Sequence, residues 1–193
     1  MIVARDQEQR FTPEEYFTWE EQQLEKHELI DGRVYAMSGG TKNHSAIATN
    51  CLLLIRSHLR GSKCSVFNSD LKINILHTPN YTYPDLSVTC DDREHSLYIT
   101  YPCLIVEVLS PNTEAYDRGK KFEQYRRNPN LMDYVLVSSE EMAIDIYHKN
   151  EAGDWLILSY RPGDIVELKS IGLSLPIEQF YDEIVFEPSP DAV

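Results

Sequence analysis

The stretch YPDLSV (residues 83–88), followed by CLIVEVL (103–109) and DRGKK (117–121), decides the fold of this chain. Residues 103–106 are continuously apolar, which is typical of a strand buried on both faces. Glu107 comes at the end of this predicted strand, and Asp85 stands in front of a second strand-like run. Two acids at neighbouring strand ends, with lysines on the following helix, can hold a hard cation and stabilise an anion beside it. The pattern therefore points to metal-assisted cleavage of a phosphodiester.

The length and composition are those of one soluble globular domain, with 193 residues, 42% of them hydrophobic and 25% charged. We expect this domain to span residues 1–193, with residues 1–10 and 187–193 as flexible tails. No apolar run is long enough to cross a membrane, and residues 1–23 lack the apolar segment of a signal peptide. These features predict a cytoplasmic protein without a membrane partner.

The cysteines support the same compartment. The chain has four of them, Cys51, Cys64, Cys90 and Cys103, and they form no C-x-x-C pair. At least three lie in apolar, core-like surroundings. We therefore expect neither a zinc site nor a disulfide, as is usual in a reducing cytoplasm.

The formal net charge of −13 bears on the choice of partner. Non-specific affinity for nucleic acid comes from basic groups that neutralise phosphates, so an acidic chain binds DNA weakly on its own. A cleft with a bound metal ion can nevertheless reverse the sign of the local field. The charge therefore disfavours tight DNA binding by the isolated chain, while a metal-dependent nuclease remains compatible with it.

The order of predicted elements gives an α/β domain with a mixed central sheet flanked by helices and a β-rich C-terminal extension. A capping box of Thr12 and Glu15 starts the first helix, and Asp31-Gly32 is a two-residue hairpin turn. The predicted helices are residues 12–24, 43–60, 113–127 and 176–181. The predicted strands are residues 27–37 (a hairpin), 64–68, 71–76, 86–88, 103–106, 131–137, 143–160 (a second hairpin) and 165–168.

Five motifs in this order carry a family resemblance. They are HELIDG with Glu28, GGTKN followed by His44, PD with Asp85, EVLSP with Glu107, and YDRGKKFEQY with Lys121. Together they resemble the Uma-two type putative restriction endonuclease family, which is abundant in cyanobacteria and belongs to the PD-(D/E)xK nuclease superfamily. Each motif alone is weak, but five in order, over residues 12–184, are fairly specific.

The resemblance implies a restriction-endonuclease-like fold and a Mg²⁺ or Mn²⁺ cofactor. It implies that Asp85 and Glu107 are metal ligands, that the main-chain carbonyl of Val108 is a further ligand, and that Glu28 joins the site. The sequence departs from the superfamily at the lysine two residues after the glutamate, because Leu109 stands there. The resemblance places the catalytic lysine on the following helix, at Lys121.

Helix phase chooses between the two adjacent lysines. At about 100° per residue, Lys121 lies beside the apolar face marked by Phe122 and Tyr125, whereas Lys120 points to solvent. A lysine that flanks an apolar stripe can bury its stem and bring its ammonium to the sheet. The alternative is an exposed Asp117–Lys121 pair with little effect on stability or activity.

Two further candidate site residues, Glu28 and His44, can each be explained by a purely structural role. Glu28 alone would be expected to pair with Arg33 across its hairpin. His44 shares the inward face of its helix with Ile47 and Cys51, where a histidine is more often a satisfied core residue than a catalytic one. For both residues, the family resemblance adds a role at the catalytic site as an alternative to the structural one.

Asp70 and Lys72 form a D-x-K pattern that could be mistaken for the missing catalytic pair. Strand alternation points both side chains away from the face of Leu71 and Ile73. The pattern leaves a cross-strand ion pair and a secondary contact to the site as equal alternatives.

The function that follows is a Mg²⁺-dependent endonuclease acting on DNA, with Asp85, Glu107, Lys121, Glu28 and His44 at the catalytic site. Cleavage of both strands would suit a two-fold homodimer. The rival hypothesis is a catalytically idle module that keeps the nuclease fold for assembly or regulation, which the negative charge favours. A metal-dependent hydrolase of another phosphoester is a weaker third possibility.

Overall fold

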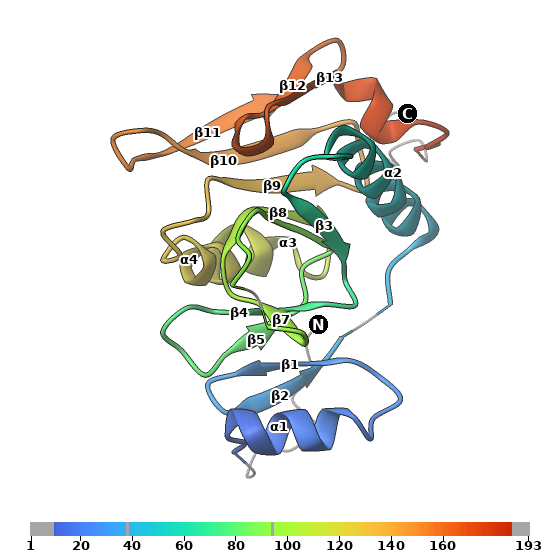
Figure 1. Ribbon diagram of the computed structural model, residues 1–193. Coiled ribbons are helices and arrows are strands. Elements are labelled where there is room, and N and C mark those ends of the chain that lie inside the picture. Colours follow the sequence, from blue (N-terminus) through green and yellow to red (C-terminus); the bar gives the residue numbers. More distant parts are fainter. Residues whose placement is uncertain (1–9, 38, 94, 187–193) are drawn as a thin grey trace.

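The computed structural model describes residues 10–37, 39–93 and 95–186. The expectation of flexible tails concerns residues that, apart from Arg10, lie outside this part of the chain. The predicted α/β class, with a mixed sheet flanked by helices, is confirmed (Figure 1). Within the described residues, no helix is both long and apolar enough to cross a bilayer.

A six-stranded sheet forms the centre of the molecule, and its only parallel pair is β8 with β9. In spatial order its strands are β11 (Trp155–Tyr160), β10 (Ile144–Lys149), β9 (Asp133–Ser138), β8 (Pro102–Leu109), β6 (Leu86–Thr89) and β3 (Ser65–Asn68). The hairpin β10–β11 therefore continues the central sheet. The extension proper is the small antiparallel pair β12 (Ile165–Leu168) and β13 (Leu173–Pro176).

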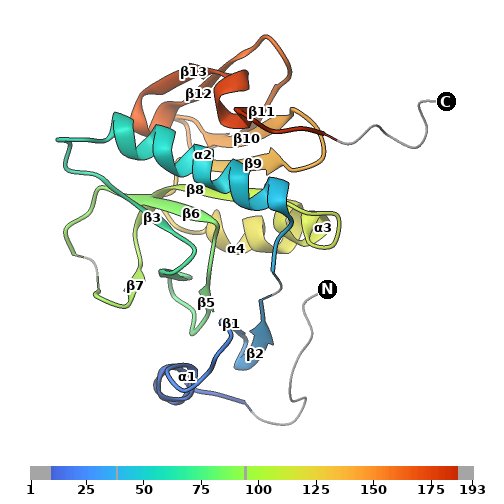
Figure 2. The same cartoon turned by 90° about the vertical axis from the view of Figure 1, so that its right-hand side faces the viewer.

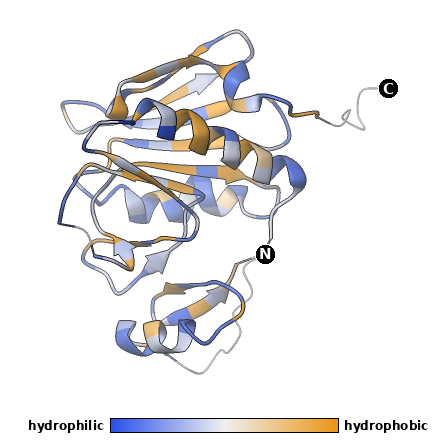
Figure 3. Ribbon diagram, turned by 45° about the vertical axis from the view of Figure 1, so that its right-hand side comes forward, coloured by the Kyte–Doolittle hydropathy of each residue, from blue (hydrophilic) through white to orange (hydrophobic). Residues whose placement is uncertain are grey.

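Strand β8 is buried on both faces, as its apolar run predicts. Leu104, Val106 and Val108 pack into the core under α2 (Lys42–His58), and the alternate residues Ile105 and Leu109 pack into the core that contains Tyr125. Figure 2 shows α2 across one face of the sheet, with α3 and α4 on the other side. Figure 3 shows the matching concentration of apolar residues along the central strands. Alternation places Glu107 on the same side of β8 as Ile105 and Leu109.

A second sheet carries the N-terminal part of the chain and leads into the site. In spatial order it contains β2 (Arg33–Ala36), β1 (His27–Ile30), β5 (Tyr81–Thr82), β4 (Lys72–Asn74) and β7 (Tyr98–Ile99). The predicted hairpin turn is confirmed, with Asp31 and Gly32 at φ 51° and 78°. Such positive φ angles favour glycine, which explains the Asp-Gly pair.

Helix α1 (Pro13–Glu20) begins with the predicted capping box. The Thr12 N–H donates to Glu15 at 2.8 Å, and the Glu15 N–H donates to Thr12 Oγ1 at 3.3 Å. The helix ends at Glu20 instead of Leu24, because the next residues bring nothing apolar to the core and Leu24 is fully exposed.

The predicted helix 113–127 is present but is interrupted by a wider turn. It consists of α3 (Glu114–Tyr116), a π-helical segment η1 (Asp117–Lys121) and α4 (Phe122–Tyr125). The Tyr134 hydroxyl on β9 donates to the main-chain carbonyl of Asp117 at 2.9 Å and holds this turn against the sheet. π-Helical turns are often found at functional sites. The C-terminal part adds two 3₁₀ segments, η2 (Lys169–Ile171) and η3 (Ile177–Tyr181), the second at the predicted short helix.

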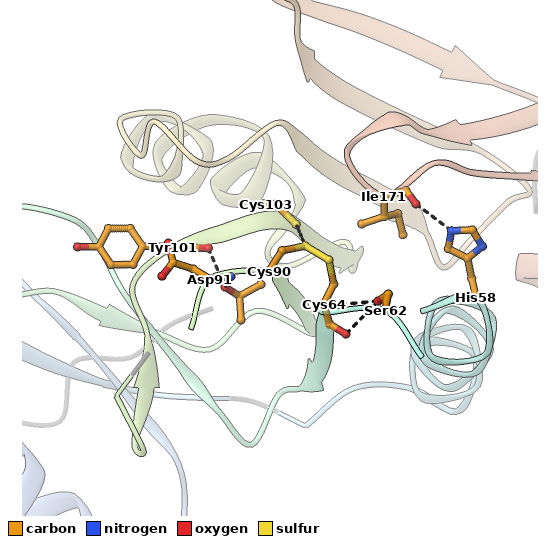
Figure 4. Close-up of a disulfide and its surroundings, with 9 residues drawn as sticks. His58, Ser62, Cys64, Cys90, Asp91, Tyr101, Cys103 and Ile171 are labelled. Atoms are coloured by element: carbon orange, nitrogen blue, oxygen red, sulfur yellow. Dashed lines mark hydrogen bonds between the residues drawn. A yellow bond between two sulfur atoms is a disulfide. The ribbon is translucent and has the colours of Figure 1, made fainter. Parts of the chain in front are cut away.

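The expectation that the chain has no disulfide is wrong. Cys64 and Cys90 are bonded to each other, and Figure 4 shows the bond with Cys103 beside it. The pairing follows from the strand register: Ser65 lies opposite Thr89, so the next antiparallel pair is Cys64 and Cys90. The two residues are 26 positions apart in sequence, and no local pattern shows that their strands are neighbours.

Candidate active site

The sheet register brings the two central carboxylates together. Leu86 lies opposite Val106 in the antiparallel pair of β6 and β8, and Asp85 is therefore opposite Glu107 one step further along. The main-chain N–H of Val108 donates to Asp85 Oδ2 at 2.7 Å, which fixes the carboxylate against β8. Asp85 keeps an opening to solvent, with 19% of its side chain exposed.

Glu107 lies inside its strand and not at its end. Strand β8 continues through Val108 to Leu109, and Glu107 remains paired with Leu136 of β9. Only 4% of the residue is exposed. The prediction that the strand ends at Glu107 is therefore wrong, and this buried carboxyl needs a partner inside the protein.

Lys121 is that partner. Its Nζ lies 2.8 Å from Glu107 Oε1, 3.9 Å from Glu28 Oε1 and 3.7 Å from Asp117 Oδ1. Lys121 lies four residues before Tyr125, and both are buried, whereas Lys120 is exposed. The alternative of an exposed Asp117–Lys121 pair is wrong, because the π-helical turn directs both side chains inward.

Glu28 reaches the same group from the hairpin. Across the hairpin it lies opposite Tyr35, and the predicted partner Arg33 lies opposite Ile30. The carboxyl is buried and accepts a hydrogen bond from the main-chain N–H of Tyr83 at 3.0 Å. Glu28 is therefore held between the two sheets and faces Lys121.

His44 lies in the first turn of α2, whose N-cap is Thr41, and stands beside Asp85. Its Nε2 is 3.4 Å from Asp85 Oδ2, and about a fifth of its side chain is exposed. The hydrogen bond with Asp85 raises the pKa of His44, burial opposes this, and a backbone hydrogen bond with Val108 adds to the rise. His44 is therefore part of this group and not only a core histidine.

A close approach of the backbone explains the glycine four residues before His44. A Cβ placed on Gly40 would lie 2.7 Å from His44 Nδ1, a distance that forces the ring to move. A Cβ on the neighbouring Gly39 would meet nothing within 4 Å. Only the second glycine of this pair is needed for the position of the imidazole.

One cation surrounded by several carboxyls sets the protonation of the cluster. Burial raises the pKa of Glu107 well above its usual value, and Lys121 offsets this only in part. Burial likewise raises the pKa values of Glu28 and Asp117. Burial alone would lower the pKa of Lys121, but Glu107 and Glu28 raise it well above its usual value. Because the carboxyls outnumber the ammonium, the lysine stays charged and the excess carboxyls tend to hold protons.

Sequence reasoning underestimated two residues of the π-helical segment and its flank. Asp117 enters the sequence-based prediction only in the alternative of an exposed pair with Lys121, and no motif marks Tyr116. Burial raises the pKa of Tyr116, and the Glu28 carboxyl raises it further. The Tyr116 hydroxyl is buried and has no hydrogen-bond partner among the described residues. The four-residue spacing of Asp117 and Lys121 is the available signal, because it puts both on one helix face, but it does not show that this face is buried.

Asp70 and Lys72 lie outside this group and do not pair with each other. Asp70 forms an ion pair with Lys26, and its pKa is lowered chiefly by that contact. The Lys72 ammonium lies 5.0 Å from the ring centroid of Tyr83 and 5.4 Å from that of Phe17, which indicates cation–π contacts. Lys72 therefore forms neither the predicted cross-strand ion pair with Asp70 nor the predicted secondary contact to the site.

The donor atoms suit a hard cation, although the described residues contain no group of three or more His, Cys, Asp or Glu side chains placed to bind a metal ion. Two carboxylates and a main-chain carbonyl are oxygen donors of the kind that Mg²⁺ and Mn²⁺ prefer. Glu107 Oε1 is buried and lies 2.8 Å from the Lys121 ammonium. By donor type alone, Asp85, Glu107 and the carbonyl of Val108 would suit a divalent cation.

Comparisons with known proteins agree with the motifs. The sequence profile of the Uma2 family, described as "Putative restriction endonuclease", matches residues 13–178. Two uncharacterized proteins of Synechocystis sp. (strain ATCC 27184 / PCC 6803 / Kazusa) are similar over most of their length. The protein slr1290 is 58% identical over 92% of this chain and 94% of its own, and sll1609 is 31% identical over 81% of this chain and 90% of its own.

A solved structure shares the fold. It is the crystal structure of a putative nuclease belonging to DUF820 from Anabaena variabilis, which matches 88% of this chain and 97% of that chain. The TM-score is 0.69 and the sequence identity is 20%. The similarity shows that the two chains share a fold over most of their length.

Removing the ammonium group of Lys121 should destabilise the protein, and the size of this effect should depend on pH. At about pH 8 we expect Lys121→Met to cost about 3–5 kcal/mol of unfolding free energy, because it leaves buried carboxyls unpaired. Their folded-state pKa values are raised, so the stability they allow is present at low pH and is lost as the pH rises through those values. The penalty should therefore shrink at about pH 5, as measured by urea unfolding. Lys120→Met is the matched control and should change stability by less than about 0.5 kcal/mol. An equal loss of unfolding free energy at both pH values would contradict the claim that Lys121 compensates the charge of the buried carboxyls.

The two glycines before α2 give a second paired test. Gly40→Ala should push the His44 ring away from Asp85 and return the imidazole pKa toward its usual 6.5. Gly39→Ala should leave the raised pKa of His44 unchanged. Both values can be read from NMR titrations of the imidazole signals. Retention of the raised pKa in Gly40→Ala would show that the backbone does not position this ring.

Proposed function

The chain belongs to the Uma2 family of putative restriction endonucleases, and from this premise we propose that it is a metal-dependent endonuclease that hydrolyses phosphodiester bonds of DNA. The observation that supports this most is the buried pair of Lys121 and Glu107, with Asp85 opposite Glu107 across the sheet. An ammonium and two carboxylates at one point are the groups that cleavage of a phosphodiester requires.

Asp85, Glu107 and the Val108 carbonyl would hold Mg²⁺ or Mn²⁺. A divalent cation bound there polarises the scissile phosphate and lowers the pKa of the attacking water. Nucleases with this fold generally use divalent metals, and the oxygen donors agree with that expectation.

The protein's own residues would orient the substrate and stabilise its charge. Lys121 would place its ammonium beside the phosphate oxygens, and Glu28 and Asp117 would hold that side chain in position. His44 lies on the open side of the group with Asp85, at the N-terminal end of α2. A raised pKa keeps this imidazole protonated to a higher pH, which favours contact with an anionic phosphate.

The acidic chain sets limits on how DNA would be bound. With a formal net charge of −13, affinity for DNA is expected to be weak and to fall steeply with salt. A homodimer would place two such sites on a duplex, one for each strand. We propose a cytoplasmic location, where DNA is present, and a single domain, because the two main cores share strands β8 and β9.

The rival proposal is an idle module that retains the nuclease fold. The negative charge favours it, whereas the complete set of Asp85, Glu107 and Lys121 favours the enzyme. Metal binding separates the two at little cost, since an idle module has no need of the cation.

A divalent cation should stabilise the folded protein by mass action. Mg²⁺ or Mn²⁺ should raise the melting temperature, because only the folded chain brings Asp85 and Glu107 together. The double variant Asp85→Asn, Glu107→Gln should remain folded and lose this response, and titration calorimetry should detect binding to the wild type alone. An equal shift in both proteins would remove the site from consideration.

Cleavage should depend on the metal and on Lys121. We expect nicking or cutting of DNA only with Mg²⁺ or Mn²⁺, at low salt, in a gel assay with single-stranded, duplex and branched substrates. Lys121→Ala should abolish turnover and keep metal binding, whereas Lys120→Ala should leave turnover nearly intact. Wild-type protein that is inert on all substrates with both metals would favour the idle module. A larger loss in Lys120→Ala than in Lys121→Ala would refute the assignment of the catalytic lysine.

A further inference from the structure

Three cysteines lie together at the end of the central sheet, away from the carboxylate cluster. Cys64 precedes β3, Cys90 follows β6, and Cys103 lies near the start of β8 (Figure 4). Cys64 and Cys90 are bonded, and the Cys103 Sγ lies 3.8 Å from the Cys90 Sγ. The fourth cysteine, Cys51, is buried in α2 with 1% exposure.

A β-bulge explains why Cys103 faces the disulfide. Val88 pairs with Leu104, but Thr89 pairs with Pro102, so Cys103 is the extra residue of β8 between these two pairs. Strand alternation would put Cys103 on the same side as Ile105, yet it packs with the core that contains Leu104. A bulge redirects a side chain in this way, and here it brings a free thiol to a disulfide.

We propose that Cys64, Cys90 and Cys103 form a thiol–disulfide exchange relay that makes Cys64 a modification site for low-molecular-weight disulfides. The Cys103 thiolate attacks the Cys90 sulfur and forms the Cys90–Cys103 bond. The Cys64–Cys90 bond breaks, and its electron pair leaves on the Cys64 sulfur. The number of disulfides is unchanged, so this step needs no oxidant.

The second step consumes a small disulfide. The released Cys64 thiolate attacks glutathione disulfide, forms a mixed disulfide with one glutathione, and releases the other as a thiolate that takes up a proton. Cys64 suits this role because it is half-buried directly after residues 61–63, which are exposed. Cys103 is half-buried beside the disulfide. The exchange therefore moves the free thiol from Cys103 to Cys64, which directly follows exposed residues.

The exchange also changes which strands are linked. The starting disulfide joins the edge strand β3 to β6, and the product joins β6 to β8. Burial, with a smaller effect of the Asp133 carboxylate on β9, raises the pKa of Cys103 to about 11. The thiolate is therefore scarce at neutral pH and the exchange is slow there, so the test is run at about pH 9.

Tryptic mapping can follow every bond, because the cysteines fall in different peptides. Cys64 lies in residues 64–72, Cys90 in residues 73–93 and Cys103 in residues 94–118. Full-length protein is incubated with glutathione disulfide, quenched in acid, digested without reductant and analysed by mass spectrometry. We expect peptide 73–93 linked to peptide 94–118, with a glutathione adduct on peptide 64–72.

Variants make the result decisive. Cys64→Ser should form the Cys90–Cys103 bond nearly completely, and Cys103→Ser should keep peptide 64–72 linked to 73–93 without an adduct. Cys51→Ser is the matched control and should behave as the wild type. Absence of the Cys90–Cys103 bond in Cys64→Ser would overturn the relay. An adduct on Cys103 in place of Cys64 in the wild-type protein would overturn it as well.

Discussion

The buried ammonium of Lys121 is the interaction on which the rest of the structure depends. It joins Glu28 from the N-terminal hairpin, Glu107 from the central strand and Asp117 from the π-helical turn. Each of these carboxyls is buried, and each would carry a large desolvation cost without a cation beside it. The two sheets and the helix between them are therefore held in register by one charge.

Such a cluster is a poor device for stability alone. Well-packed apolar residues of similar size often stabilise a core as much as a buried ion pair, or more. Burial, with a smaller effect of the neighbouring carboxyls, raises the pKa values of Glu107 and Glu28, and the group contains more carboxyls than cations. Asp85 and His44 lie at the side of the group that is open to solvent, since about a fifth of each side chain is exposed. The proposed binding of a cation and a phosphate would give this arrangement a role that packing alone does not.

Local patterns in the sequence determined the elements and much of their phase. The capping box of Thr12, the Asp31-Gly32 turn and the apolar run before Glu107 each describe one element, and each is present. The inward position of Lys121 also follows locally, because it stands four residues before Tyr125. These signals suffice since helix caps, tight turns and side-chain periodicity depend on residues only a few positions apart.

Only the tertiary structure decided which elements meet. Strand register sets Asp85 opposite Glu107, and the same register bonds Cys64 to Cys90. The packing of the π-helical segment buries Asp117 beside Lys121, and their four-residue spacing alone does not show whether the shared face is buried. In each case the sequence shows a residue and its local geometry, but the partner lies on another strand or sheet. Which partner it meets depends on how the apolar faces pack together, and that is a property of the whole chain.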